Sequence, residues 1–269
     1  MRPGKVLHRF RLGWLRPRLA GPMGPILGHA GSEIHTRAWR RTPKKGRSAQ
    51  HPSISWFERA RPERRLVRGR AYRRAKRLMD LSLVVLGLPL ILTVLALCWC
   101  AIKLESPLRP ALFVQPRTGL RGKRFPMLKF RTMVPDAEEI KGDLLAYSKL
   151  RWPDFKMDND PRVTRVGRIL RTTSLDELPQ IFNVVKGDMS LVGPRPTSFA
   201  ADTYEPWQRP RLRVLPGLTG LWQISGRASL EFDERVRLDL AYIKVRSLSV
   251  DFQILARTFG AVLFRRGAS

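Results

Sequence analysis

The residues best suited to chemistry lie in one stretch, residues 164–196, which reads TRVGRILRTTSLDELPQIFNVVKGDMSLVGPRP. Its arginines include Arg168, Arg171 and Arg195, and their planar, always-charged guanidinium groups suit phosphate oxygens. Arg195 lies between two prolines that fix the backbone on either side, so this turn holds the arginine at low entropic cost. The pattern indicates a surface that binds polyphosphate.

A second group of candidate residues follows the run KFRTM at residues 129–133. Asp136 comes three residues later, at the expected start of a helix over residues 136–150, followed by Glu138 and Glu139. Asp136 and Glu139 are three apart and share a helix face, whereas Glu138 does not. A carboxylate here can attack phosphorus, with the upstream cations nearby. Alternatively, acids at a helix start only complement its dipole.

Asp176 and Glu177 form a third acidic pair. Ser174 and Glu177 match a capping box, in which each side chain satisfies the other's backbone N–H, at the start of a helix over residues 174–185. Pro179 falls within its first turns, where proline is tolerated. We therefore expect a structural role for Glu177. For Asp176, holding Arg171 and approaching a metal both stay open.

The charge of the 269-residue chain is strongly positive and uneven. The formal net charge is +29, and residues 1–80 carry 22 lysines and arginines against four acids. Such a balance favours polyanionic partners: nucleic acid, anionic lipid or a phosphorylated substrate. Residues 1–70 are rich in Arg, Pro and Gly without periodicity, which predicts a disordered basic tail. That tail lacks the continuous apolar core of a secretory signal.

A membrane segment follows the tail. Residues 81–102 read LSLVVLGLPLILTVLALCWCAI, 22 residues without a charge, and a helix of this length crosses a hydrocarbon core of about 30 Å. Basic residues flank both ends, and the positive-inside rule then places both ends in the cytoplasm. A re-entrant helix broken at Pro89 satisfies that rule. The alternative is one tilted span, which places the C-terminal part outside.

The remaining elements are short. Residues 113–119 and 124–132 alternate partly between apolar and polar around LRGK, which predicts a β-hairpin. Residues 232–264 predict two helices around Ser247–Ser249, the second over residues 252–264. The second has an apolar face with flanking arginines, and this fits a membrane-interface helix and a core-facing helix equally well.

These blocks, in this order, resemble the bacterial sugar transferase family, the monotopic phosphoglycosyl transferases that start polysaccharide or glycoconjugate assembly on a polyprenyl phosphate. The resemblance runs from about Lys76 to Val262. Its pieces are KRLMD (76–80), the apolar segment, KLESP (103–107), GLRGKRFPMLKFRTM (119–133), DNDPRVTRVGRILRTTSLDELPQIFNVVKGDMSLVGPRP (158–196), PGLTGLWQISGR (216–227) and LDLAYI (238–243).

The resemblance implies transfer of a sugar 1-phosphate from a nucleotide diphosphate sugar, usually a UDP-sugar, to undecaprenyl phosphate, with release of the nucleoside monophosphate. It also implies Mg²⁺ and a covalent aspartyl-phosphosugar intermediate. Asp136 is then the nucleophile and metal ligand, with Glu139 as its acidic partner and Glu138 as the alternative. The residues expected to bind phosphate or substrate are Lys129, Arg131, Arg171, Asp176, Arg195 and Arg227.

Three features depart from the family pattern. The family's small members have an Asp-Glu pair where this chain has Asp136 followed by Ala137. Pro116 stands before Arg117, where the family usually has an acid. The helix-breaking proline is Pro89, about one turn before its usual place, which Thr93 occupies here.

We therefore expect a mainly α protein with a small β-hairpin (α+β): a basic tail (1–70), a re-entrant or membrane-spanning helix (71–104) and a catalytic domain (105–264) with interfacial amphipathic helices. It would lie in the bacterial inner membrane and face the cytoplasm, a homodimer being left open. An inactive scaffold of the same fold is one alternative. A membrane-anchored polyanion-binding protein is the other, but the excess charge lies in the tail rather than on a domain with stacking aromatics, which argues against nucleic acid.

Overall fold

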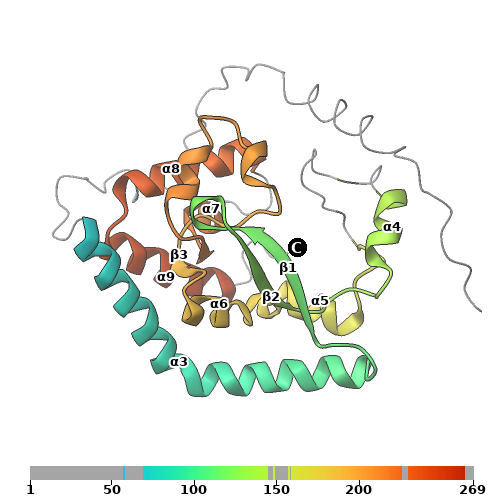
Figure 1. Ribbon diagram of the computed structural model, residues 1–269. Coiled ribbons are helices and arrows are strands. Elements are labelled where there is room, and N and C mark those ends of the chain that lie inside the picture. Colours follow the sequence, from blue (N-terminus) through green and yellow to red (C-terminus); the bar gives the residue numbers. More distant parts are fainter. Residues whose placement is uncertain are drawn as a thin grey trace, which may run out of the picture. The chain divides into compact units, whose positions relative to one another are not determined.

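A computed structural model describes residue 57, residues 69–144, residues 148 and 157, and residues 159–225 and 230–263. The predicted tail thus lies almost wholly outside the described residues. All described residues belong to one compact unit, and their elements follow one another as shown in Figure 1: α3 (Gly69–Glu105), β1 (Leu112–Thr118), η3 (Leu120–Gly122), β2 (Arg124–Phe130), α4 (Ala137–Leu144), α5 (Arg165–Thr172), η5 (Leu175–Glu177), α6 (Gln180–Lys186), β3 (Ser190–Val192), η6 (Ala201–Thr203), η7 (Arg209–Arg213), β4 (Gly217–Thr219), α7 (Leu221–Ser225), α8 (Phe232–Val245) and α9 (Leu248–Leu263).

The predicted hairpin is confirmed. Strands β1 and β2 pair antiparallel, with Leu112 opposite Phe130 and Thr118 opposite Arg124. Arg121 and Gly122 adopt positive φ angles in the tight connection, where the glycine does so without steric cost. A second sheet among the described residues pairs β3 and β4 in parallel. These elements agree with the predicted α+β class.

Helix α3 is long, apolar and bent. It is helical through Pro89, and Figure 1 shows two arms that meet at a bend rather than at a broken segment. Proline removes one helical hydrogen bond, and the Thr93 hydroxyl donates to the Pro89 carbonyl at 2.9 Å, a contact that also favours bending. Among the described residues, α3 alone is long and apolar enough to cross a membrane.

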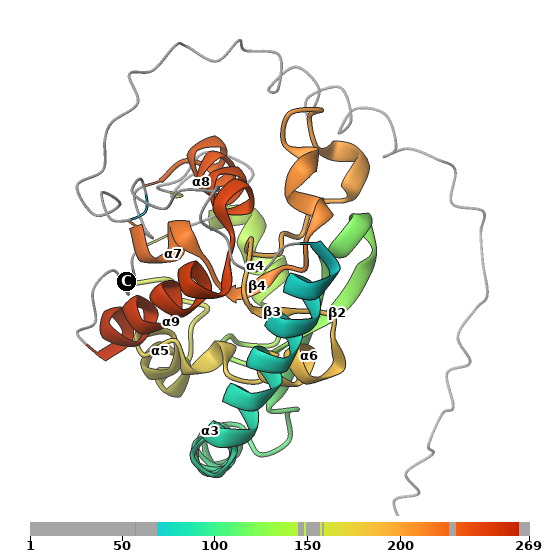
Figure 2. The same ribbon diagram turned by 90° about the vertical axis from the view of Figure 1, so that its left-hand side faces the viewer.

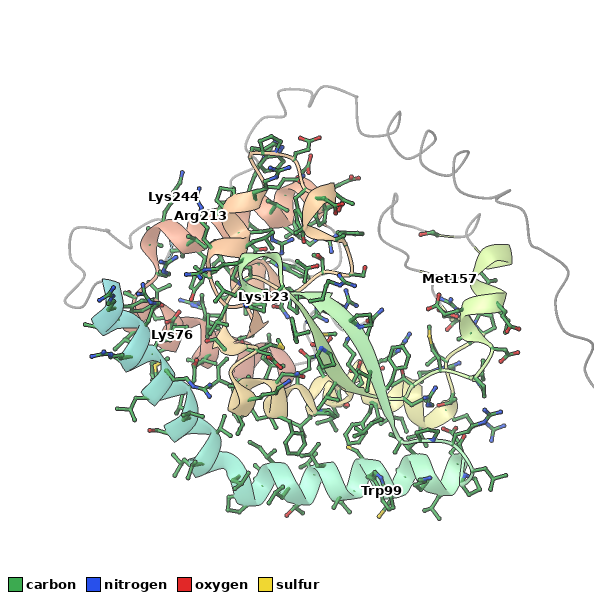
Figure 3. All side chains as sticks on the ribbon, viewed as in Figure 1. Lys76, Trp99, Lys123, Met157, Arg213 and Lys244 are labelled. Atoms are coloured by element: carbon green, nitrogen blue, oxygen red, sulfur yellow. The ribbon has the colours of Figure 1, made fainter. Side chains whose placement is uncertain are left out.

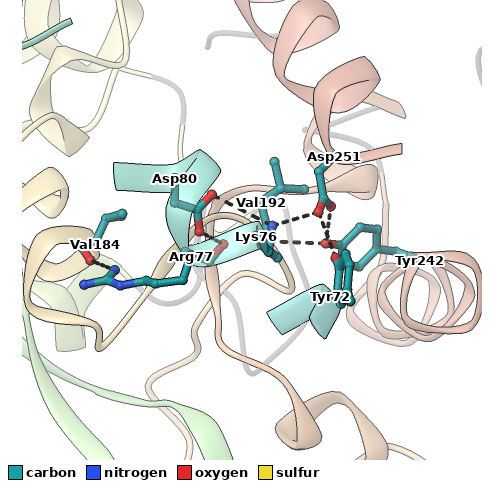
Figure 4. Close-up of polar contacts among 9 residues, drawn as sticks. Tyr72, Lys76, Arg77, Asp80, Val184, Val192, Tyr242 and Asp251 are labelled. Atoms are coloured by element: carbon teal, nitrogen blue, oxygen red, sulfur yellow. Dashed lines mark hydrogen bonds and ion pairs between the residues drawn. The ribbon is translucent and has the colours of Figure 1, made fainter. Parts of the chain in front are cut away.

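The first arm of α3 is fixed to the rest of the unit by buried polar groups (Figure 4). The Asp251 carboxylate on α9 accepts hydrogen bonds from Tyr72 at 2.8 Å, Lys76 at 3.0 Å and Tyr242 at 2.5 Å. Asp80 accepts another from the Ser190 hydroxyl. Because buried charges are costly unless they are paired, this network fixes one face of the arm inward.

The second arm lies beside the hairpin and α5. Its residues Leu95, Cys98 and Ile102 pack with Phe130 of β2 and Leu170 of α5. A separate apolar cluster joins α3, β2, α6, β3 and α9. Together these contacts set the position of the hairpin and of α5, which carry the candidate site.

Two predicted helices differ from the structure. The segment after Ser174 forms η5 and then α6, because Ser174 adopts a left-handed conformation and its side chain makes no cap hydrogen bond. The predicted capping box with Glu177 is therefore wrong. The helix predicted over residues 136–150 is present as α4; residues 145–147, 149 and 150 lie outside the described part of the chain.

The two predicted C-terminal helices are present, and α9 begins at Leu248, inside the predicted break and four residues before its predicted start. Helix α9 has the core-facing side that one of the two alternatives required; the membrane-interface alternative stays a prediction. Val250 and Ile254 are buried in the core, whereas Phe252 and Phe259 are exposed. One face therefore packs inward and another is apolar and uncovered by the described residues.

Candidate active site

The centre of the candidate site is Glu177, at the end of η5. Its carboxylate accepts a hydrogen bond from the Lys129 ammonium at 3.0 Å. It also accepts two from the Arg195 guanidinium, one of them at 2.8 Å. Burial alone would raise the pKa of Glu177, but Arg195 and Lys129 outweigh it and hold that pKa well below its usual range. Glu177 thus holds two cations side by side before any substrate is present.

Different elements bring these groups together. Lys129 lies near the end of β2, and Arg195 lies in the Pro-Arg-Pro turn that follows β3. That turn packs tightly: a Cβ at Gly193 would lie 2.6 Å from the Leu215 carbonyl oxygen. Because no side chain fits there, glycine allows the turn to pack directly against the segment leading into β4. Lys129 and Arg195, two of the residues predicted to bind phosphate, are therefore close together.

Asp176 and Arg171 lie around the same centre. Burial raises the pKa of the Asp176 carboxyl despite the opposing charge of Lys129, and Glu177 raises it further. Arg171 lowers that pKa through its charge and donates a hydrogen bond from Nε to the Thr132 hydroxyl at 2.9 Å. Asp176 therefore lies among the cations, in surroundings that favour a protonated carboxyl more than water does.

Arg117 belongs to the cluster, although the sequence analysis did not include it among the site residues. On the hairpin, Arg117 is opposite Phe125 and Phe113 is opposite Lys129, so alternation places Arg117 and Lys129 on the same face. Burial, with Arg195 as the second cause, lowers the pKa of Arg117 to about 10. Its Nη2 donates to Gln115 at 2.5 Å, while its buried Nε has no hydrogen-bond partner in the described part of the chain. The alternation of side chains along the predicted hairpin was the signal in the sequence that could have placed Arg117 on the same face as Lys129.

A buried guanidinium beside another cation is an arrangement that an anion stabilises. The nearby positive groups Arg117, Lys129, Arg171 and Arg195 outnumber the carboxylates Asp176 and Glu177, so the local field is positive. Guanidinium forks recognise phosphate oxygens in pairs. The cluster can therefore bind a phosphate or diphosphate group.

The acidic turn lies between β2 and α4. Asp136 immediately precedes α4, and its carbonyl accepts the backbone N–H groups of Glu139 at 3.0 Å and Ile140 at 3.1 Å. Its side chain is exposed, as are those of Glu138 and Glu139. The charges with the largest effects on Asp176 and Glu177 come from the cluster itself, chiefly Lys129 and Arg195. The structure thus places the predicted nucleophile at a helix start and does not join it to the cation cluster by a hydrogen bond within the described residues.

A buried ion pair supports the acidic turn. Arg162 donates to both Asp160 oxygens, at 2.9 and 2.7 Å, and its Nη1 donates to the carbonyl of Ala137, the first residue of α4, at 3.1 Å. The backbone carbonyl of Arg162 also accepts the N–H of Val134 at 2.9 Å. The sequence did not indicate this role for the Asp160–Arg162 pair, because Ala137, whose carbonyl Arg162 binds, lies 25 residues away in the chain.

One of the predicted binding residues, Arg131, is not in the cluster, and another cannot be placed. Arg131 donates to the Pro110 carbonyl at 2.9 Å and lies over the Phe113 ring, at the open end of the hairpin. Arg227 lies outside the described residues. Among the described residues no group of three or more His, Cys, Asp or Glu side chains is arranged to hold a metal. A cation at Asp136 would therefore need further ligands from a bound phosphate and water, a coordination typical of Mg²⁺.

Fold and site define an α+β protein in which a long apolar helix lies beside a cation cluster suited to phosphate and an exposed acidic turn. The chain belongs to the bacterial sugar transferase family, whose sequence profile matches residues 71–265. This confirms the family resemblance noted in the sequence.

The similar proteins are transferases by name. The chain is 45% identical over 198 residues to the galactosyl transferase CpsE of Streptococcus agalactiae, which covers 72% of this chain and 43% of that protein. It is 49% identical over 164 residues to an undecaprenyl-phosphate galactose phosphotransferase of Salmonella typhimurium. This match covers 59% of this chain and 34% of that protein. It is 44% identical over 197 residues to a UDP-glucose:undecaprenyl-phosphate glucose-1-phosphate transferase of Caulobacter vibrioides. This match covers 70% of this chain and 69% of that protein. The chain thus spans less than half the length of the first two proteins.

Proposed function

We propose that this protein is a phosphoglycosyl transferase that moves a sugar 1-phosphate from a UDP-sugar to undecaprenyl phosphate, the first membrane step of exopolysaccharide or related glycan synthesis. The observation that carries the proposal is the cation cluster around Glu177, in a chain of the bacterial sugar transferase family. The names of the relatives from Salmonella and Caulobacter support the lipid acceptor, and the name of the second supports a UDP-sugar donor.

The proposed reaction has two displacements at phosphorus. An Asp136 carboxylate oxygen attacks the phosphorus that carries the sugar, the bond between that phosphorus and the bridging oxygen breaks, and UMP leaves with the bridging oxygen. A phosphate oxygen of undecaprenyl phosphate then attacks the phosphorus of the aspartyl phosphosugar. The bond from Asp136 to phosphorus breaks, which restores the carboxylate and yields the lipid diphosphate sugar.

The chain's own cations have a defined task in this scheme. Lys129, Arg195 and Arg117 neutralise the charge of the diphosphate, and Glu177 holds the first two in place so that little reorganisation is needed. Asp136, exposed at the start of α4, has the positive partial charge of a helix N-terminus beside it. Glu139 is its acidic partner on the same helix face, with Glu138 the alternative.

Mg²⁺ fits the exposed acidic turn. The ion takes one or two carboxylates, several waters and substrate phosphate oxygens, so Asp136 with Glu139 or Glu138 is a sufficient protein contribution. Bound there, it would neutralise charge on the transferred phosphate.

The proposed place of the enzyme is the bacterial inner membrane, with α3 re-entrant and the site facing the cytoplasm, where UDP-sugars are available. The bend of α3, the proline inside this helix (Pro89), and the basic residues before and after the apolar segment support that topology.

The test is a transfer assay on the full chain in nanodiscs with undecaprenyl phosphate, Mg²⁺ and a panel of UDP-sugars, read as UMP release. We expect release that requires both the lipid and Asp136, with Asp136→Asn run in parallel. Release that persists in Asp136→Asn would exclude Asp136 as nucleophile and direct attention to Glu138 and Glu139. No release with any sugar from a folded, lipid-embedded protein would overturn the proposal and favour a scaffold.

A further inference from the structure

A shallow basic pocket lies on the first turns of α3. It has a volume of about 540 Å³ and is lined by Arg70, Arg73, Arg74, Arg77, Leu78 and Leu81. These positions recur at three- and four-residue intervals, so they form one face of the helix. The pocket therefore combines four guanidinium groups with two aliphatic side chains.

Most of these cations have no partner among the residues that the structure describes. Arg70, Arg73 and Arg74 are exposed, and within the described part of the chain none of them forms a hydrogen bond or an ion pair. Arg77 differs: it donates to the carbonyls of Val184 at 2.5 Å and Val185 at 2.7 Å, at the C-terminal end of α6. Like charges crowded on one helix face repel each other, so an anion in the pocket would stabilise them.

The other side of this arm is bound to the rest of the protein, so the pocket faces outward. Tyr72 and Lys76 are bound by Asp251, and Asp80 is bound by Ser190, so the helix cannot turn its arginines inward without breaking a buried network (Figure 4). Figure 3 shows this arm, marked by Lys76, well away from the second arm, marked by Trp99.

The outward face changes character along the helix. After the arginines, Leu78, Val85 and Leu86 are 68%, 67% and 81% exposed. Arginines followed by exposed aliphatic side chains match the order of a membrane surface, with charged headgroups outside and hydrocarbon beneath. Leu78 and Leu81, inside the pocket itself, lie at that transition.

We propose that this pocket binds the headgroup of an anionic phospholipid, with its phosphate on Arg70, Arg73 and Arg74 and the start of an acyl chain along Leu78 and Leu81. The site is separate from the proposed acceptor site. It lies at the N-terminal end of α3, whereas the other end reaches the catalytic elements, where Glu105 accepts the backbone N–H of Val166 on α5 at 3.2 Å. The proposal requires that α3 lies in a membrane and does not require that sugar transfer occurs.

The test compares two triple variants of equal charge in the full chain. Arg70→Gln/Arg73→Gln/Arg74→Gln empties the pocket of its free cations. Arg121→Gln/Arg209→Gln/Arg213→Gln removes three exposed arginines from a different pocket, between η3 and η7, and is the matched control. Each protein is purified in neutral detergent and titrated with phosphatidylglycerol or phosphatidylcholine, and the retained lipid is counted by native mass spectrometry. Circular dichroism melting verifies that each variant is folded.

We expect the wild type and the control to retain phosphatidylglycerol in preference to phosphatidylcholine, and the pocket variant to bind phosphatidylglycerol at least about tenfold more weakly, since three surface cations account for roughly a 100-fold effect. The basic tail is the same in all three proteins, so its contribution cancels. Equal losses in both variants, or no loss in the pocket variant, would overturn the proposal. So would displacement of phosphatidylglycerol by an equimolar amount of undecaprenyl phosphate, because the pocket would then be an acceptor site.

Discussion

The cation cluster and the acidic turn are close in function but opposite in construction. Around Glu177 the charges are largely shielded from water and already paired, with Lys129 at 3.0 Å and Arg195 bidentate. At the acidic turn, the side chains of Asp136, Glu138 and Glu139 are exposed, and Arg162 donates to the backbone carbonyl of Ala137 at 3.1 Å. The cation cluster is therefore preorganised by paired charges, whereas the acidic turn exposes its carboxylates.

This difference has a physical reason. Cations that bind a diphosphate repel each other, so a carboxylate between them keeps them in place until the substrate arrives. A nucleophilic carboxylate must not be tied up in an ion pair, because its oxygen lone pair has to reach phosphorus. If the two regions divide the work in this way, substitutions in each should change different kinetic constants.

The largest effect is expected at the nucleophile. Asp136→Asn keeps the shape of the side chain and removes the attacking carboxylate, so kcat should fall by roughly 10³-fold or more while substrate binding is retained. Steady-state UMP release and equilibrium binding of the UDP-sugar measure the two quantities. A variant that keeps kcat and loses binding would reverse the division of work proposed for the two regions.

The next effect is expected at the cluster. Glu177→Gln removes the charge that holds Lys129 and Arg195 together, so kcat/KM should fall by about 10- to 100-fold, in the range of lost charge-assisted hydrogen bonds. The control is Asp188→Asn, which removes the carboxylate of a more exposed pair with Lys186. Equal activity of the two variants would show that Glu177 does not organise the cations.

A smaller effect is expected at the support of the acidic turn. Asp160→Asn frees Arg162, which binds the first carbonyl of α4, and should lower kcat about tenfold through misplacement of Asp136, with KM nearly unchanged. Asp202→Asn, at an exposed carboxylate, is the control. The same kinetics for both variants would exclude a positioning role for Asp160.

The smallest effect concerns stability and pH. Burial raises the pKa of Asp239 to about 6, against the opposing charge of Arg211 at 2.7 Å. Because the folded state holds this proton more tightly than the unfolded chain, the contribution of Asp239 to stability is present at low pH and is lost as pH rises toward 6. Between pH 4 and 6 the melting temperature of the wild type should therefore fall relative to that of Asp239→Asn. A constant difference between the two proteins across this window would contradict the shifted pKa.

Local patterns in the sequence predicted the hairpin and the two C-terminal helices correctly, because alternation and helical periodicity report which face is buried. They also singled out Lys129 and Arg195, which the fold brings together on Glu177; their role in binding stays a prediction. The contacts of Arg117 and of the Asp160–Arg162 pair were missed, since both depend on segments brought together by the fold. The capping box failed because Glu177 has stronger partners in two cations than in a backbone N–H.

The covalent intermediate on Asp136 is best tested by intact-protein mass spectrometry of the full chain in nanodiscs, mixed with UDP-sugar and Mg²⁺ without lipid acceptor. We expect a mass increase of one sugar phosphate, located on Asp136 by peptide mapping. The increase should be absent from Asp136→Asn and should be lost when undecaprenyl phosphate is added. An adduct on Glu138 or Glu139, or an adduct that persists in Asp136→Asn, would contradict that expectation.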